Sequence, residues 1–86
     1  DAMNMRVFPN PSLGASVVNF SLSSPELVKL RVSDVHGKVL YTAEQQFSEG
    51  DQAWPLDFGA MRRSAAYFVT LTAGDRQVTQ KAIVVR

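Results

Sequence analysis

Apolar and polar residues alternate with a period of two along most of this 86-residue chain. Successive side chains of a β-strand point to opposite faces of a sheet, so this period indicates strands with one buried face rather than helices. The alternation is clearest over residues 18–22, 28–32, 54–58 and 67–71. We therefore expect an all-β domain.

The turn signals between these segments predict about seven short strands, the first at residues 5–8 and the last at residues 78–85. Short strands at this spacing are typical of an immunoglobulin-like antiparallel β-sandwich, which is the fold we predict. Its core should contain the alternating apolar residues Val18, Phe20, Val28, Leu30, Val32, Val69 and Leu71. Pro55 cannot donate to a ladder, so the strand around it should lie at a sheet edge or carry a bulge. Residues 57–64 are predicted to form at most one irregular or helical turn.

The length allows one small domain, which buries only about 60% of the surface of its unfolded chain and has little room for an enclosed pocket. Hydrophobic residues make up 45% of the chain and charged residues 20%, a composition that excludes disorder. The formal net charge of +1 gives no electrostatic footprint for nucleic acid, so we expect no nucleic-acid partner. Cysteine is absent, which excludes a disulfide framework and a thiolate metal site.

The start of the chain lacks the charged and apolar regions of a signal peptide and does not look like a natural N-terminus. We expect the chain to be a piece of a larger protein. Residues 1–4 are interpreted as a linker or a cloning remnant, and residues 5–86 as the domain.

The sequence offers no set of residues for catalysis or metal binding. His36 is the only histidine, and Gly37 beside it predicts the tip of a β-hairpin, where glycine supplies a positive φ. The acidic residues are placed in different turns rather than at the short spacing of a calcium loop: Glu49, Asp51, Asp57 and Asp75. We therefore expect no enzyme activity, no cofactor, no metal and no small-molecule substrate.

Two turn motifs separate the predicted strands. The first motif consists of Phe8, Pro9, Asn10 and Pro11. Each proline fixes its own φ and restricts the residue before it, so this motif predicts a rigid corner after the first strand. The second motif lies in the central hairpin turn and consists of Asp34, Gly37 and Lys38.

The last six residues have the strongest claim to a binding function. They are Lys81, Ala82, Ile83, Val84, Val85 and Arg86. The apolar run at residues 83–85 predicts a final strand that either lies centrally in its sheet or exposes an edge to another chain.

The order and placement of these motifs resemble the C-terminal sorting domain, in a type A-like form, of proteins exported by the type IX secretion system. In that family a strand ending in Tyr or Phe is followed by Pro-Asn-Pro, as at residues 8–11. A strand followed by Asp and then Gly-Lys matches residues 34–38, and an aromatic strand matches residues 67–69. The family closes with a basic residue, a β-branched run and a terminal basic residue, as at residues 81–86. Many members carry glycine just before the aromatic strand, where this chain has residues 64–66, Ser-Ala-Ala.

The resemblance implies a secretion signal carried by a folded domain. Cargo of this family crosses the inner membrane by an N-terminal signal peptide, and the type IX outer-membrane translocon then recognises the C-terminal domain. A sortase-like peptidase usually removes the domain and attaches the cargo to anionic lipopolysaccharide. The expected location is therefore secreted or at the cell surface, after passage through the periplasm and outer membrane of a Gram-negative bacterium.

Recognition by the type IX machinery should use main-chain pairing at exposed strands and side chains near the C-terminus, with residues 81–86 as the candidate contacts. An exposed edge strand also permits self-association. These partners are proteins, and their identity follows from the resemblance alone.

Two alternatives to a sorting signal stay open from the sequence. One is an immunoglobulin-like carbohydrate-binding or adhesion module of a secreted enzyme, with Trp54, Tyr41 and Phe68 as stacking residues if they are exposed. Burial of Trp54 in the core would remove this alternative. The other is an enzyme fragment, for which no acid, base and nucleophile can be assembled.

Overall fold

The computed structural model describes residues 3–59 and 65–85. In these residues it has seven strands: β1 (Arg6–Phe8), β2 (Ala15–Leu22), β3 (Glu26–Ser33), β4 (Val39–Phe47), β5 (Gly50–Asp57), β6 (Ala65–Ala73) and β7 (Arg76–Val84). The predicted all-β class and strand number are confirmed. This described part contains no helix that could span a membrane. The turn expected over residues 57–64 falls mostly on residues 60–64, which lie outside the described residues.

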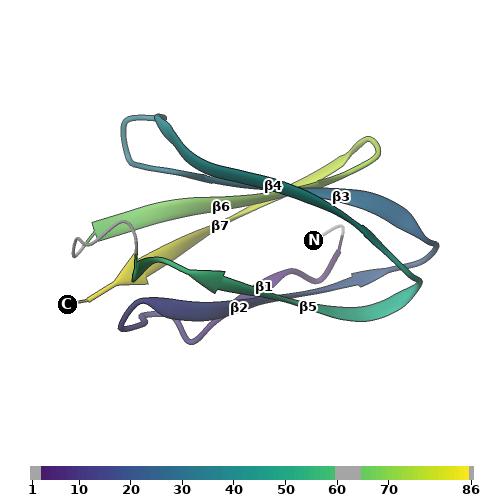
Figure 1. Ribbon diagram of the computed structural model, residues 1–86, viewed down its shortest axis with the longest axis horizontal. Coiled ribbons are helices and arrows are strands. Elements are labelled where there is room, and N and C mark those ends of the chain that lie inside the picture. The colour runs from purple at the N-terminus through teal and green to yellow at the C-terminus, as the bar shows by residue number, and fades with distance from the viewer. Residues whose placement is uncertain (1–2, 60–64, 86) are drawn as a thin grey trace.

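The strands form two antiparallel sheets that face each other as the layers of a β-sandwich (Figure 1). The smaller sheet has the order β1-β2-β5 and the larger sheet has the order β4-β3-β6-β7. Constant-type immunoglobulin domains place their fourth strand with the first two, whereas β4 here pairs with β3. β5, the strand that carries Pro55, lies at an edge as predicted. The fold is thus a β-sandwich whose fourth strand belongs to the larger sheet.

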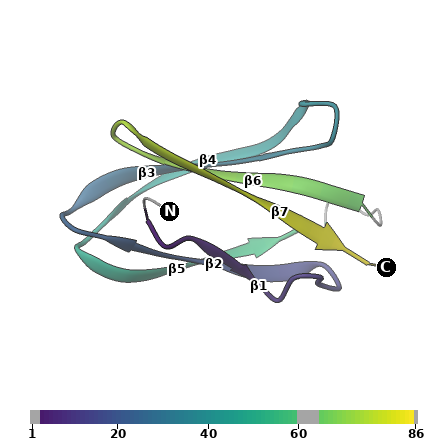
Figure 2. The ribbon, with the colours of Figure 1, turned by 180° about the vertical axis from the view of Figure 1, so that it is seen from behind.

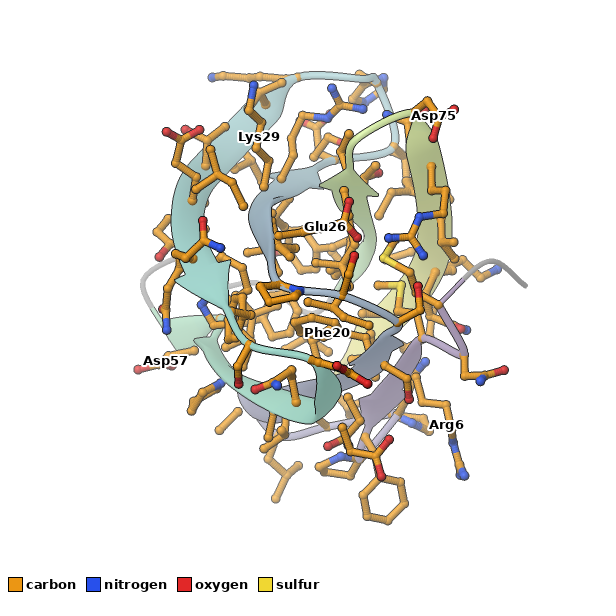
Figure 3. All side chains as sticks on the ribbon, turned by 90° about the vertical axis from the view of Figure 1, so that its right-hand side faces the viewer. Arg6, Phe20, Glu26, Lys29, Asp57 and Asp75 are labelled. Carbon is orange, nitrogen blue, oxygen red and sulfur yellow. The ribbon has the colours of Figure 1, made fainter. Side chains whose placement is uncertain are left out.

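The core lies between the two sheets and is built from the alternating apolar residues. All seven predicted core residues are buried: Val18, Phe20, Val28, Leu30, Val32, Val69 and Leu71. Figure 3 shows Phe20 between the layers, while Lys29 and Asp57 point outward. The ring of Phe47 lies 5.1 Å from that of Phe20 and 5.2 Å from that of Trp54, measured between centroids. Such aromatic pairs contribute about 0.5–1.5 kcal/mol each beyond the burial of their area.

The residues just ahead of β1 also pack with the domain. Met3 and Met5 are buried, and the carbonyl of Met3 accepts a hydrogen bond from the N–H of Ser21 at 2.8 Å. Met3 and Met5 therefore belong to the core although both precede the first strand.

The β6–β7 hairpin closes with a two-residue turn at Gly74 and Asp75. Gly74 has a φ of 62°, a conformation that glycine adopts without steric cost. Arg76 then donates to the carboxylate of Glu26, which ties the start of β7 to β3 across β6. This tight turn sets the register of the whole closing strand.

Candidate functional site

The predicted recognition segment forms the end of β7, the outer strand of the larger sheet. Ala82 and Val84 point into the core, where each is 2% exposed. Lys81, Ile83 and Val85 alternate with them and point to the outer face of the sheet. The segment is therefore divided between packing residues and residues that a partner can reach, and Arg86 lies outside the described residues.

The backbone of β7 presents alternate residues to β6 and to its open side. Ala73 pairs with Arg76 on either side of the two-residue turn, and the register continues to the pair of Ala65 with Val84. Residues that flank such a turn exchange both hydrogen bonds, and the pattern repeats at every second residue. The N–H and C=O groups of the odd-numbered residues from 77 to 85 therefore point away from β6.

The loop that follows β1 runs along this open side of β7 (Figure 2). Asn10 Nδ2 donates to the carbonyl of Lys81 at 2.8 Å, and Asn10 Oδ1 accepts from the N–H of Ile83 at 2.8 Å. The N–H of Ser12 donates to the carbonyl of Ile83 at 2.9 Å, and the carbonyl of Ser12 accepts from the N–H of Val85 at 2.8 Å. Four consecutive outward groups of β7 are thus bonded within the domain, and we call Asn10 and Ser12 the edge clamp.

The edge clamp is anchored to the smaller sheet. Ser16 Oγ, on β2, donates to the carbonyl of Pro9 at 2.9 Å. Ser12 is only 4% exposed, and its Oγ accepts from the N–H of Gly14 at 3.3 Å. The peptide bonds before Pro9 and Pro11 are both cis. The corner predicted after the first strand is present, and it also connects the smaller sheet to the closing strand.

The second motif forms the β3–β4 hairpin turn, as predicted. Asp34 Oδ1 accepts hydrogen bonds from the N–H groups of His36 at 2.8 Å and Lys38 at 3.0 Å, and Gly37 has a φ of 82°. Desolvation acts to raise the pKa of Asp34. The two backbone hydrogen bonds and the nearby positive charges outweigh it and hold the pKa below its ordinary value of 3.8. Asp34 therefore shapes this turn as a carboxylate.

A small mixed surface forms where β6 and β7 run together on the outer face of the larger sheet. Phe68 of β6 pairs with Lys81, and Ile83 follows two residues along β7. Phe68 and Ile83 are half-buried, and Val85 is 48% exposed. We call these four residues the outer terminal face, which combines a basic group with apolar side chains.

Comparison with known families settles what kind of domain carries these features. A family model described as a secretion system C-terminal sorting domain matches residues 6–85. The chain belongs to this family. The sorting domain is the C-terminal signal for type IX secretion, so the function implied by the resemblance is confirmed. A search of curated proteins gives no match.

Membership also determines the destination and the general partner of the sorting domain. Such a domain directs secretion through the outer membrane to the cell surface or the extracellular space. It interacts with the type IX secretion machinery, and its family is not catalytic.

The acidic residues of the sorting domain remain separate. Among the residues that the structure describes, no three His, Cys, Asp or Glu side chains form a group that could hold a metal ion. Asp51 and Asp57 lie within β5 and not in turns, which corrects the sequence interpretation. Asp51 accepts a hydrogen bond from Ser21 Oγ at 2.8 Å, and Asp57 accepts one from the N–H of Gly59 at 2.7 Å. These carboxylates therefore act locally in the strand and its end.

The three candidate stacking residues of the sorting domain lie in different places. Trp54 is only 8% exposed, and its ring packs against Phe47 in the core. Tyr41 pairs with Val32 and so lies on the inner side of β4, whereas Phe68 lies on the outer face of β6. The burial of Trp54 removes the carbohydrate-binding alternative.

Ser12 is the site residue that the sequence analysis missed. It directly follows the Pro-Asn-Pro motif, but its bonds reach Ile83 and Val85 at the far end of the chain. Asn10 and Lys81 are likewise 71 residues apart. No local sequence pattern predicts a contact at that separation. The contact between the first motif and residues 81–85 was therefore found only in the structure.

Proposed function

We propose that the type IX translocon recognises the outer terminal face of the sorting domain together with Arg86. The observation that supports this is the alternation along β7, which turns Lys81, Ile83 and Val85 outward. The intervening residues are buried and hold the strand to the core. A partner that meets the folded domain here would contact a basic group beside apolar side chains, a combination that favours specific docking.

The turn residues of the two family motifs act on the fold in this proposal. Asn10 holds the end of β7, Pro9 and Pro11 flank it in the corner that is bonded to β2, and Asp34, Gly37 and Lys38 shape the β3–β4 turn. Their contribution to export is then indirect, because they keep the recognised surface in place.

After recognition, we propose that a sortase-like peptidase removes the domain and attaches the cargo to anionic lipopolysaccharide at the surface of a Gram-negative bacterium. Family membership supports this step. The domain itself would catalyse nothing, since its single histidine lies exposed in a turn, and it would need no cofactor and no small-molecule substrate.

We also propose that self-association, where it occurs, uses β4. This strand lies at the edge opposite β7, is nine residues long and is exposed over most of its length. A second copy could pair with it by adding its own β4.

The test of recognition is an export assay with a periplasmic reporter that carries the sorting domain at its C-terminus. The variant Lys81→Ser/Arg86→Ser should reduce the amount of reporter at the cell surface. The control Lys29→Ser/Arg31→Ser removes the same two charges from the exposed outer side of β3 and should be exported normally. Thermal melts of both variants separate recognition from unfolding, because exposed charges usually change stability by about 0.5 kcal/mol or less. Normal export of a folded Lys81→Ser/Arg86→Ser variant would contradict the proposal.

A further inference from the structure

We infer that the Asn10 side chain occupies the place of an additional strand at the edge of β7. It thereby positions the C-terminal segment so that a partner meets the side chains of this segment and not its main chain. The part of this inference that concerns export rests on the proposed function. The part that concerns the edge stands on the geometry alone.

The edge clamp follows the hydrogen-bond pattern of a parallel ladder. A residue in such a ladder donates to the carbonyl before its partner and accepts from the N–H after it. Ser12 does this with its backbone around Val84, with which it forms a parallel bridge. Asn10 makes the same two bonds around Ala82, but it uses its side-chain amide. Ser12 therefore extends the sheet with its backbone, and Asn10 extends it by one further position with its side-chain amide.

The residue type at position 10 follows from this geometry. An asparagine side chain offers one donor group and one acceptor on the same planar amide, as a peptide does. An aspartate of the same shape has no donor for the carbonyl of Lys81, and an alanine offers neither group. Both Asn10 bonds are 2.8 Å long, so the amide is used on both sides.

The closed part of the edge coincides with the candidate recognition segment. Upstream on β7, the outward groups of Gln77 and Thr79 have no backbone hydrogen bond among the described residues. From the carbonyl of Lys81 to the N–H of Val85, the outward groups are bonded. An added strand could not pair with this stretch unless the edge clamp left it. A partner that binds the folded domain here therefore meets Lys81, Ile83 and Val85 by their side chains.

The edge clamp also limits fraying at the C-terminal end of β7. Terminal residues fray unless they are tied down, and the last residues of β7 have β6 on one side only. With the clamp present, the end of β7 is held on both sides. Without it, Ile83 and Val85 should open locally while the rest of the sandwich stays folded.

The experiment compares Asn10→Ala with two other variants of the chain. Asn10→Asp keeps the size and the acceptor of the side chain but removes the donor. Asn19→Ala is the matched control, because Asn19 is an exposed asparagine on β2. Amide hydrogen exchange of Ile83 and Val85 is measured by NMR, and export is measured with the reporter fusion.

Asn10→Ala should speed the exchange of the Ile83 amide by roughly tenfold, which corresponds to the loss of one net hydrogen bond. Asn10→Ala and Asn10→Asp should both lose export, and Asn19→Ala should behave as the parent in exchange and in export. Unchanged exchange at Ile83 in Asn10→Ala would overturn the strand-substitute role. Faster exchange with full export in both Asn10 variants would overturn the positioning role.

The two proposals can fail separately. Full export of Lys81→Ser/Arg86→Ser would refute recognition through the basic residues and leave the exchange result untouched. Should Asn10→Ala fail to fold, exchange in Asn10→Asp decides the same question, because unchanged protection of the Ile83 amide in that variant would show that the amide donor is not needed.

Discussion

The larger sheet has two edges, and the domain treats them in opposite ways. The edge of β7 is closed near the C-terminus by Asn10 and Ser12. The edge of β4 is open: its register with β3 turns the N–H and C=O groups of Thr42 and Glu44 outward, and no backbone partner meets them among the described residues. Because an unpaired edge can accept another strand, the sorting domain protects the edge that carries the proposed recognition segment and leaves the other edge open.

The open edge has weaker devices against unwanted pairing. The β3–β4 ladder shifts its register between Val32 and Ser33, and such irregularities increase local twist. Glu44 adds one charge near the middle of β4. Bulges and charges reduce edge pairing without blocking it, so β4 remains the place where a second copy would add.

The largest expected effect comes from the core that both edges share. Leu30 is 1% exposed and pairs with Ala43 of β4 on one side and Leu71 of β6 on the other. Leu30→Ala should lower the free energy of unfolding by about 2–5 kcal/mol and loosen both edges together. Tyr41→Ala, at a side chain that is 43% exposed, should cost much less. Equal shifts of the denaturant midpoint in the two variants would show that β4 packs more tightly than the structure indicates.

Adjacent prolines on β4 test which groups of the open edge are free. The N–H of Gln45 faces β3, whereas the N–H of Glu44 faces outward. Gln45→Pro should cost about 1–3 kcal/mol, because it leaves a carbonyl of β3 without its donor. Glu44→Pro should cost less, since it removes no ladder bond, and it should weaken any self-association seen by sedimentation. A larger loss of stability in Glu44→Pro than in Gln45→Pro would contradict the register of β4 that we describe.

Truncation of the clamp should have a moderate effect on stability. Asn10→Ala removes two hydrogen bonds from the closed edge and should lower the free energy of unfolding by about 1–2 kcal/mol. Thr42→Ala, an exposed position on the open edge, should stay within about 0.5 kcal/mol. Chemical denaturation of the two variants measures the difference, and equal stabilities would mean that the closed edge is no stronger than the open one.

The smallest effect is expected from pH at the turn that leads into β4. The pKa of Asp34 is lowered in the folded state, so its carboxylate contributes stability above the unfolded value of 3.8. That contribution is lost as the pH falls from 3.8 through the lower folded value. An NMR titration of Asp34 should give a pKa below 3.8, and Asp34→Asn should remove this part of the acid dependence. A measured pKa at or above 3.8 would contradict the role of the carboxylate in the turn.

The sequence predicted the parts of the fold that depend on local pattern. Alternation identified the core residues such as Phe20 and Leu30, Pro55 indicated an edge strand, and Gly37 indicated a hairpin turn. The sheet to which each strand belongs was not predictable, because consecutive strands β2 and β3 lie in opposite sheets.

The candidate site was predicted in its components but not in its assembly. The run at residues 83–85 indicated either a central strand or an open edge, and the structure shows an edge that is already closed. The closing groups come from Asn10 of the first motif and from Ser12 directly after it, and Asn10 lies 71 residues from Lys81. A contact of that range depends on how the two sheets stack, and alternation within single strands carries no information about it.

Amide hydrogen exchange in the unmodified domain compares the two edges in one experiment. The amides of Ile83 and Val85 and those of Thr42 and Glu44 all point outward from edge strands of the same sheet. If the clamp closes the end of the β7 edge, Ile83 and Val85 should exchange slowly, while Thr42 and Glu44 exchange at close to the rate of an unstructured peptide. Exchange of Ile83 and Val85 as fast as that of Thr42 and Glu44 would show that both edges are open and would contradict the protection of β7 by the edge clamp.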